Sequence, residues 1–156
     1  MTLGTVYLAG PITGCEFDTC VDWRDKWVME FLEEDIICLS PMRGKSYLSN
    51  SGRIKERYDE FPLCTDQGIM ARDHFDCSRA NVIVFNVFNA GLPSLGTTME
   101  AAWGFRDHTP MVWIIEPKGN PHDHPMLRRC MDFRVTSEDE AKQIVRAILK
   151  PHIGHR

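Results

Sequence analysis

Asn81-Val-Ile-Val-Phe-Asn86 is the most strand-like run in the sequence, and it leads into Gly91-Leu-Pro-Ser-Leu-Gly-Thr-Thr-Met-Glu-Ala-Ala-Trp-Gly-Phe105. The pattern predicts a buried strand that opens into a loop of small residues and then a helix with Glu100 in its first turn. Gly96 allows close approach of the backbone, Thr97 offers a hydroxyl, and the free amides at a helix start attract anions. We therefore expect a ligand at this junction.

Glu100 has two competing interpretations. It completes a capping box, Thr97-x-x-Glu100, in which the glutamate would bond the backbone amide of the N-cap residue. It also fits a nucleophile, a carboxylate kept ionised by the positive end of the helix and directed at a sugar carbon. The spacing of the residues alone leaves both interpretations open.

Length and composition predict one domain over residues 1–156, because 156 residues with 43% hydrophobic content are enough to bury a core. A net charge of -4 gives no basic surface for polymeric nucleic acid or an anionic membrane.

No apolar run approaches the ~20 residues that span a bilayer, and the N-terminus lacks the pattern of a signal peptide. The six cysteines form no Cys-x-x-Cys pair, which favours reduced thiols. We expect a cytoplasmic protein.

Strand-like and helix-like segments alternate along the chain. Strands are predicted at residues 5–9, 36–40, 81–86, 111–115 and 132–135. Helices are predicted from Asp18 or Thr19 to about Glu33, from about Asp66 to Arg79, through Glu100 to about Arg106, and from Ser137 to Leu149. The alternation predicts an α/β fold, Rossmann-like or flavodoxin-like and doubly wound, with a mainly parallel five-stranded sheet and helices on both faces.

Two connecting segments bear on the site. Gly10-Pro-Ile-Thr-Gly14 makes a tight loop after the first strand; it is too short for a Walker loop and lacks its lysine. A loop in this position still lies at the carboxyl edge of the sheet, where such folds bind ligands. Residues 43–62 are polar with no steady period, which fits either a flap over the site or a surface insertion.

The helix before the central strand carries two aspartates with different surroundings. Asp76 has Arg72 and Arg79 at helical spacing, which predicts an ion pair on the helix surface. Asp73 has no opposite charge three or four residues away, and it precedes the strand that leads to Glu100.

His122-Asp-His124 invites interpretation as a metal site. No third and fourth ligands accompany it at a familiar spacing, so we expect a polar loop or a loop that contacts a partner subunit, and no metal.

Three segments together resemble the nucleoside 2-deoxyribosyltransferase superfamily. Val6-Tyr-Leu-Ala-Gly-Pro-Ile12 is similar to its opening strand and loop, and Asp73 with Ala80-Asn-Val-Ile-Val84 to its helix-then-strand segment. Ser94-Leu-Gly-Thr-Thr-Met-Glu100 resembles its signature, a glycine-containing loop followed by the catalytic glutamate. The resemblance covers most of the chain in order and at plausible spacing.

The resemblance implies cleavage of the N-glycosidic bond of a nucleoside or nucleotide, with no metal and no organic cofactor. It assigns Glu100 as the nucleophile that forms a glycosyl-enzyme intermediate, Asp73 as proton donor or sugar-orienting residue, and Tyr7 as a neighbour of the sugar. The chemistry agrees, because retaining glycosyl transfer needs an ionised carboxylate and a proton for the departing base. A Tyr7 hydroxyl near C2' would favour deoxyribose.

The branch of the superfamily is indicated by Ser94. The transferases proper carry an aspartate at this position, whereas the nucleoside 5'-monophosphate N-hydrolases carry a serine that helps to hold the 5'-phosphate. A neutral hydroxyl suits a phosphate dianion, which an aspartate would repel. The substrate-binding residues expected from the resemblance and the loops are Gly10, Ile12, Thr13, Gly14, Ser94, Gly96 and Thr97. Transfer to a second base and hydrolysis by water both remain open.

The resemblance also implies a homodimer or higher homo-oligomer, because the superfamily's sites borrow a residue from a neighbouring subunit. His124 is our candidate for such a contact. The alternative function on the same fold is a non-catalytic module that sequesters a nucleotide-like ligand. A flavodoxin-like redox or signalling domain is disfavoured, because neither an acidic receiver pocket nor a flavin-phosphate loop is present in the sequence.

Overall fold

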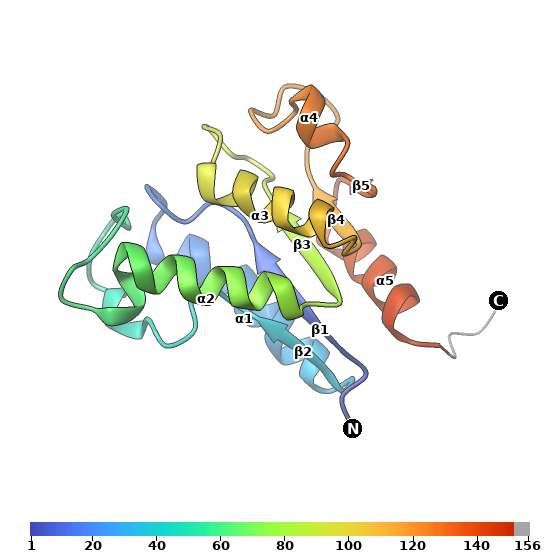
Figure 1. The fold of residues 1–156 in the computed structure, drawn as a ribbon, viewed down its shortest axis with the longest axis horizontal. Helices are drawn as coiled ribbons and strands as arrows, with labels where there is room; N and C mark the ends of the chain where they lie inside the picture. The colour runs from blue at the N-terminus through green and yellow to red at the C-terminus, as the bar shows by residue number, and fades with distance from the viewer. Residues whose placement is uncertain (152–156) are drawn as a thin grey trace.

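The architecture was analysed in a computed structural model, which describes residues 1–151. Its centre is a single five-stranded sheet in which every neighbouring pair of strands is parallel, in the order β2-β1-β3-β4-β5 (Figure 1). The strands are β1 (Gly4–Ala9), β2 (Ile36–Leu39), β3 (Val82–Asn86), β4 (Met111–Ile114) and β5 (Phe133–Val135). The predicted α/β fold and its parallel sheet are confirmed.

Helices cover both faces of the sheet. Helices α2 (Asp66–Arg79) and α3 (Leu95–Arg106) lie side by side on one face, and α1 (Phe17–Leu32) and α5 (Glu138–Leu149) cover the other (Figure 1). The sequence did not predict the short helix α4 (Pro125–Arg128) or the 3-10 turns η1 (Ser46–Leu48) and η2 (Pro62–Cys64). All three are too short to show a hydrophobic period.

Alternation along β1 explains the two-layered core. Val6 and Leu8 are fully buried against α1 and α5, while Tyr7 and Ala9 are fully buried on the side of α2 and α3. Successive strand side chains point to opposite faces of a sheet, so a strand covered on both sides has no polar face. Each large aliphatic side chain buried in this way contributes about 1.5–3 kcal/mol of transfer free energy. Tyr7 is thereby the one β1 side chain that brings a polar group beneath α3.

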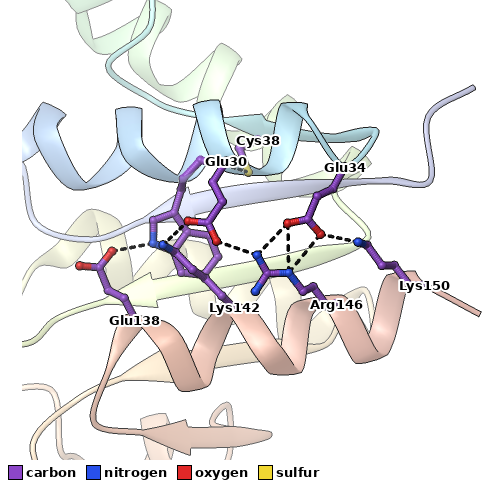
Figure 2. Close-up of polar contacts among 8 residues, drawn as sticks. Glu30, Glu34, Cys38, Glu138, Lys142, Arg146 and Lys150 are labelled. Atoms are coloured by element: carbon purple, nitrogen blue, oxygen red, sulfur yellow. Dashed lines mark hydrogen bonds and ion pairs between the residues drawn. The ribbon is translucent and has the colours of Figure 1, made fainter. Parts of the chain in front are cut away.

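Helices α1 and α5 are joined by a network of ion pairs (Figure 2). Arg146 bonds Glu34 at 2.7 Å and Glu30 at 2.6 Å, and Lys142 and Lys150 flank it on the same two carboxylates. The Arg146 guanidinium also lies 5.0 Å from the ring centre of Phe31. The hydrogen bonds of Arg146 and Lys150 lower the pKa of Glu34 to about 2. This network fixes the last helix against the first.

The start of α1 differs from the prediction. The helix begins at Phe17 and its N-cap residue is Glu16, which makes no side-chain capping bond, rather than Asp18 or Thr19. Asp18 lies in the first turn, where its charge still favours the helix dipole.

The segment 43–62 packs on a small hydrophobic cluster of its own. Leu48, Ile54 and Tyr58 are buried there with Cys20 of α1. The backbone of Ile54 bonds the first loop twice, to Gly14 at 2.7 Å and to Cys15 at 2.9 Å. The segment is therefore attached to the loop that follows β1.

The base of the same segment is fixed by Asp76, and here the prediction was wrong. Asp76 is completely buried, not on the helix surface, and it pairs with Arg43 at 2.6 Å as well as with Arg79 at 2.8 Å. Arg72 instead donates to the backbone oxygens of Arg43 and Pro41. The helical spacing revealed the Arg79 pair but not the long-range partner.

In the part of the chain that the structure describes, no helix is both long and apolar enough to cross a membrane. The six cysteines are all free thiols, and all but Cys15 are buried.

Candidate active site

The candidate site lies where the direction of strand connection reverses. After β1 the chain crosses to β2 on one side, and after β3 it crosses to β4 on the other. The loops that follow these two neighbouring strands therefore diverge and leave a crevice at the carboxyl end of the sheet. The first loop, residues 10–14, forms one side of this crevice, and the start of α3 forms the other.

Gly10 lets the first loop leave β1 close to the neighbouring strand. Its φ is 150°, and a Cβ atom there would lie 2.5 Å from the backbone oxygen of Asn86. Only glycine fits this position without moving the backbone. The side chain of Arg24 holds the same turn, because it donates to the backbone oxygens of Gly10, Leu8 and Cys20 at 3.2, 3.1 and 2.6 Å.

The start of α3 corrects the capping-box interpretation. The N-cap residue is Ser94, whose Oγ accepts from the backbone amide of Thr97 at 3.2 Å. Thr97 is thus inside the helix, and Glu100 is the sixth helical residue, in the second turn rather than the first. The Glu100 carboxylate caps no backbone amide within the described chain. It is directed instead toward the sheet.

Glu100 is held by Tyr7. The phenol Oη of Tyr7 donates to Glu100 Oε1 at 3.1 Å, and the glutamate is only 8% exposed. Burial raises the pKa of Glu100 to about 8, with the neighbouring Asp73 as the second cause, while the Tyr7 hydrogen bond and the Arg24 charge act in the opposite direction. Burial and Asp73 thus oppose the ionised form of Glu100 that is expected from the sequence, while Tyr7 and Arg24 favour it.

Asp73 lies in the same enclosed space. It is 9% exposed, and its Oδ1 atom is buried without a hydrogen-bond partner among the described residues. Burial raises its pKa, and the charge of Lys45 opposes that rise. Asp73 in turn raises the pKa of Glu100. Two neighbouring buried carboxyl groups tend to hold one proton between them. The arrangement can thus present one carboxylate and one carboxylic acid at the same time.

Two cavities adjoin these carboxyl groups. The first, of about 140 Å³, is bounded by the first loop, the segment 43–62 and the start of α3. The second, of about 260 Å³, lies between α2 and α3 and is lined by Ile69, Met70, Met99 and Trp103. Glu100 and Asp73 line both cavities. They therefore lie at the boundary between a polar and an apolar space.

Most residues predicted from the sequence meet at the first cavity. The lining residues include Glu100, Asp73, Gly10, Ile12, Thr13, Ser94, Gly96 and Thr97. Gly14 does not line it but turns the first loop with a φ of 82°. Tyr7 is fully buried behind Glu100 and lines neither cavity, so its contact in this structure is with the carboxylate and not with open space.

His124 lies apart from both cavities. Its Nδ1 atom accepts from the backbone amide of Met126 at 3.2 Å and so caps α4. It lines a separate apolar groove together with Pro93 and Phe105. Its expected role in a neighbouring subunit's site remains a prediction.

His122 is a residue that the sequence interpretation missed. It is fully buried, and its Nε2 atom accepts from the backbone amide of Ser94 at 2.9 Å. The other ring nitrogen faces Asn120 Oδ1 at 3.2 Å, which fixes the tautomer with the proton on Nδ1. Burial lowers the pKa of His122, so the ring stays neutral and accepts at Nε2. It positions the loop before α3.

Arg24 and Lys45 were also missed. Arg24 is fully buried, and its lowered pKa reflects burial opposed by neighbouring groups that include Glu100. Arg24 lies three residues before Trp27 and seven before Phe31, which places it on the buried face of α1. A positive charge on that face was the one signal in the sequence that could have indicated its role. Lys45 lies in a segment without a hydrophobic period, which left no signal for its position.

Within residues 1–151, no three His, Cys, Asp or Glu side chains gather in a way that could hold a metal ion. His122 and His124 point to different partners, as their hydrogen bonds to Ser94 and Met126 show.

The sequence matches no protein-family model and no curated protein. Among solved structures, the chain is similar to the 2-desoxiribosyltransferase from Leishmania mexicana, with a TM-score of 0.65 and 14% sequence identity. The superposition covers 96% of this chain and 99% of that chain. At this identity the likeness demonstrates the fold alone.

Proposed function

We propose that this chain, which has the fold of a nucleoside 2-deoxyribosyltransferase, cleaves the N-glycosidic bond of nucleosides or their 5'-monophosphates. The observation that carries the proposal is the buried pair Glu100 and Asp73 at the boundary of two cavities, with Tyr7 bonded to Glu100. No cofactor is required for this chemistry, because the two carboxyl groups supply both a nucleophile and an acid.

In the proposed reaction, the Glu100 carboxylate attacks the anomeric carbon of the sugar. The bond from that carbon to the base nitrogen breaks, its electron pair leaves with the base, and Asp73 in its acid form donates a proton to the base. Water or a second base then attacks the anomeric carbon, its proton passes to the Asp73 carboxylate, and the bond to Glu100 breaks to release the Glu100 carboxylate. Water gives the hydrolase reaction, and a second base gives the transferase reaction.

The raised pKa of Glu100 fits this reaction because Glu100 and Asp73 titrate together, so the pKa belongs to the pair of carboxyl groups. At neutral pH the pair holds about one proton, and the Tyr7 hydrogen bond favours the negative charge on Glu100. The proton then resides on Asp73, where the leaving base needs it. The low exposure of both groups also keeps water from competing for the charges.

The same raised pKa supports a second candidate, a non-catalytic module that sequesters a nucleotide-like ligand. A protonated Glu100 could not attack carbon, and the other residues that line the two cavities would hold the ligand. This alternative predicts that replacing Glu100 by alanine preserves ligand affinity and that no base is ever released.

The deciding experiment incubates the protein with nucleosides and 5'-monophosphates, with and without an acceptor base, and follows free base by chromatography. Wild-type protein should release or exchange base, and Glu100→Gln should lose at least about 10³-fold in rate. Glu33→Gln, at the exposed C-cap residue of α1, is the matched control and should behave as wild type. Base release that survives Glu100→Gln would refute the assignment, and tight binding without turnover would favour the sequestering module.

A homodimer or higher oligomer remains part of the proposal. Large apolar side chains are exposed beside the first cavity, including Leu92 at 79% and Leu95 at 82%. Light scattering at micromolar concentration should give a mass of at least two chains, and Leu95→Glu should reduce it. A monomer with full activity would contradict this part.

A further inference from the structure

Lys45 is a buried cation without a partner in the candidate site. It is 6% exposed and lines the first cavity, yet its Nζ atom makes no hydrogen bond or ion pair with any described residue. Burial lowers its pKa, and the nearby Asp73 opposes this shift without contacting it. A buried ammonium group costs free energy unless an anion or several acceptors satisfy it. The position therefore suits an anionic ligand bound in the first cavity.

The backbone holds Lys45 firmly in this position. Its amide donates to the oxygen of Met42 at 3.1 Å, and its own oxygen accepts from Leu48 at 3.0 Å at the start of η1. Met42 and Leu48 are themselves buried in the cluster beneath the segment 43–62. The side chain is consequently presented to the cavity by a packed turn.

The groups around Lys45 in the first cavity suit a phosphate. Thr13, Ser94 and Thr97 bring hydroxyls, and the Ser94 Oγ atom accepts the Thr97 amide and so keeps its own proton free to donate. Lys55 and Arg57 add positive charge at the exposed rim, and Glu56 is the one exposed carboxylate on that rim. Arg57 is already paired with Asp66 at 3.0 Å, so Lys45 is the inner cation without an ion pair.

The second cavity is the more apolar of the two. Met70, Met99 and Trp103 line it and suit a flat heterocyclic base, while Ile69 is shared with the first cavity. Two exposed carboxylates, Glu56 and Asp66, also line it. A nucleotide bound with its anomeric carbon at Glu100 would thus place its base in the second cavity and its 5' end in the first. The difference in polarity sets the direction of the ligand.

We propose that Lys45 binds the phosphate on the 5' oxygen of the substrate and thereby selects nucleoside 5'-monophosphates over nucleosides. This inference rests on the proposed function, since it assumes that Glu100 faces the anomeric carbon. In this proposal the segment 43–62 supplies the positive charge for the phosphate. Neither the first loop nor Ser94 carries a positive charge.

The test compares Lys45→Met, Lys45→Arg and the exposed α1 control Lys26→Met. Binding of a nucleoside and of its 5'-monophosphate is measured by calorimetry in the Glu100→Gln background, so that no turnover is needed. Lys45→Met should weaken monophosphate binding by about 10- to 100-fold, as expected for loss of a charge-assisted contact, and should change nucleoside binding by less than about 2-fold. Lys45→Arg should keep most of the preference, and Lys26→Met should keep all of it.

Inorganic phosphate provides a second measurement. It should compete with the monophosphate in protein that retains Lys45 and should lose this effect in Lys45→Met. Equal weakening of nucleoside and monophosphate, or an unchanged preference with a normal melting temperature, would overturn the proposal. If phosphate binding depends on Lys45 but the wild-type protein releases no base, the proposed function is refuted and the Lys45 assignment stands. If base is released but monophosphates are not preferred over nucleosides, the Lys45 assignment is refuted and the proposed function stands.

Discussion

Tyr7 and Glu100 are 93 positions apart in sequence, and their side chains are joined by a 3.1 Å hydrogen bond between β1 and α3. The phenol comes from the fully buried centre of the sheet, so its direction is fixed by the packing around it. The carboxylate comes from the second turn of a helix that begins at the cavity. The bond therefore ties the candidate nucleophile to the most rigid part of the molecule.

Replacing Tyr7 by phenylalanine should remove this bond with little loss of packing. We expect the pKa of Glu100 to rise further, because the Tyr7 bond now lowers it, and kcat to fall by about 10- to 100-fold. The pH dependence of kcat/KM measures the first effect. Tyr47→Phe, at an exposed tyrosine outside both cavities, is the control. An unchanged pH profile would show that the bond does not tune Glu100.

The pH profile should fall at alkaline pH. The reaction needs one proton on the pair, held by Asp73 in its acid form, and the raised pKa of about 8 marks the loss of that shared proton, so kcat/KM of the free enzyme should decrease above roughly that pH. Asp73→Asn removes the group that carries this proton, so it should abolish the alkaline fall and also reduce kcat by loss of the proton donor. A profile that stays in place in Asp73→Asn would refute the coupling of the two groups.

The Glu100 carboxyl group should also lower the free energy of unfolding at high pH. Its folded pKa is raised above that of the unfolded chain, so the unfolded state releases the proton first and stability falls between about pH 4.5 and 8. Glu100→Gln should therefore raise the free energy of unfolding by about 4 kcal/mol at pH 8 and have little effect at pH 4. Denaturant titrations at both pH values measure the difference. A destabilised Glu100→Gln at pH 8 would contradict this argument.

The α1–α5 network predicts the opposite pH dependence. The pKa of Glu34 is lowered to about 2, so its contribution is present above the unfolded value near 4.5 and is lost as pH falls through 2. Arg146→Met should destabilise the protein by about 2 kcal/mol at pH 7, since it removes four hydrogen bonds to two carboxylates and a cation–π contact. The penalty should shrink at pH 2. Arg129→Met at an exposed position is the control, and an equal effect would refute the role of the network.

His122 should act through Ser94. His122→Leu leaves the Ser94 amide without its acceptor, so we expect KM to rise by about 10-fold while kcat changes less. His122→Gln keeps an acceptor and should recover much of the loss. A fall in kcat alone, with KM unchanged, would place His122 in the chemistry instead.

The sequence predicted the fold well because strands buried on both faces leave uninterrupted apolar runs, as in β1 and β3. It predicted the local site because the residues after those strands must meet at one edge of the sheet. It failed at Asp76 and Lys45, since their surroundings depend on a segment that follows no period. It failed at the α3 cap because both Ser94 and Thr97 are good caps, and only the position of the first helical turn distinguishes them.

The segment 43–62 has consequences for how such a protein could diversify. It carries its own hydrophobic cluster and joins the sheet scaffold through the Ile54 backbone bonds and the Asp76–Arg43 pair. An exchange of residues inside it would alter one wall of the binding space without disturbing the strands that hold the carboxylates. The residues that select the ligand and the residues that carry out the reaction thus lie in separate parts of the chain. The segment 43–62 is therefore the natural target for directed evolution of substrate range.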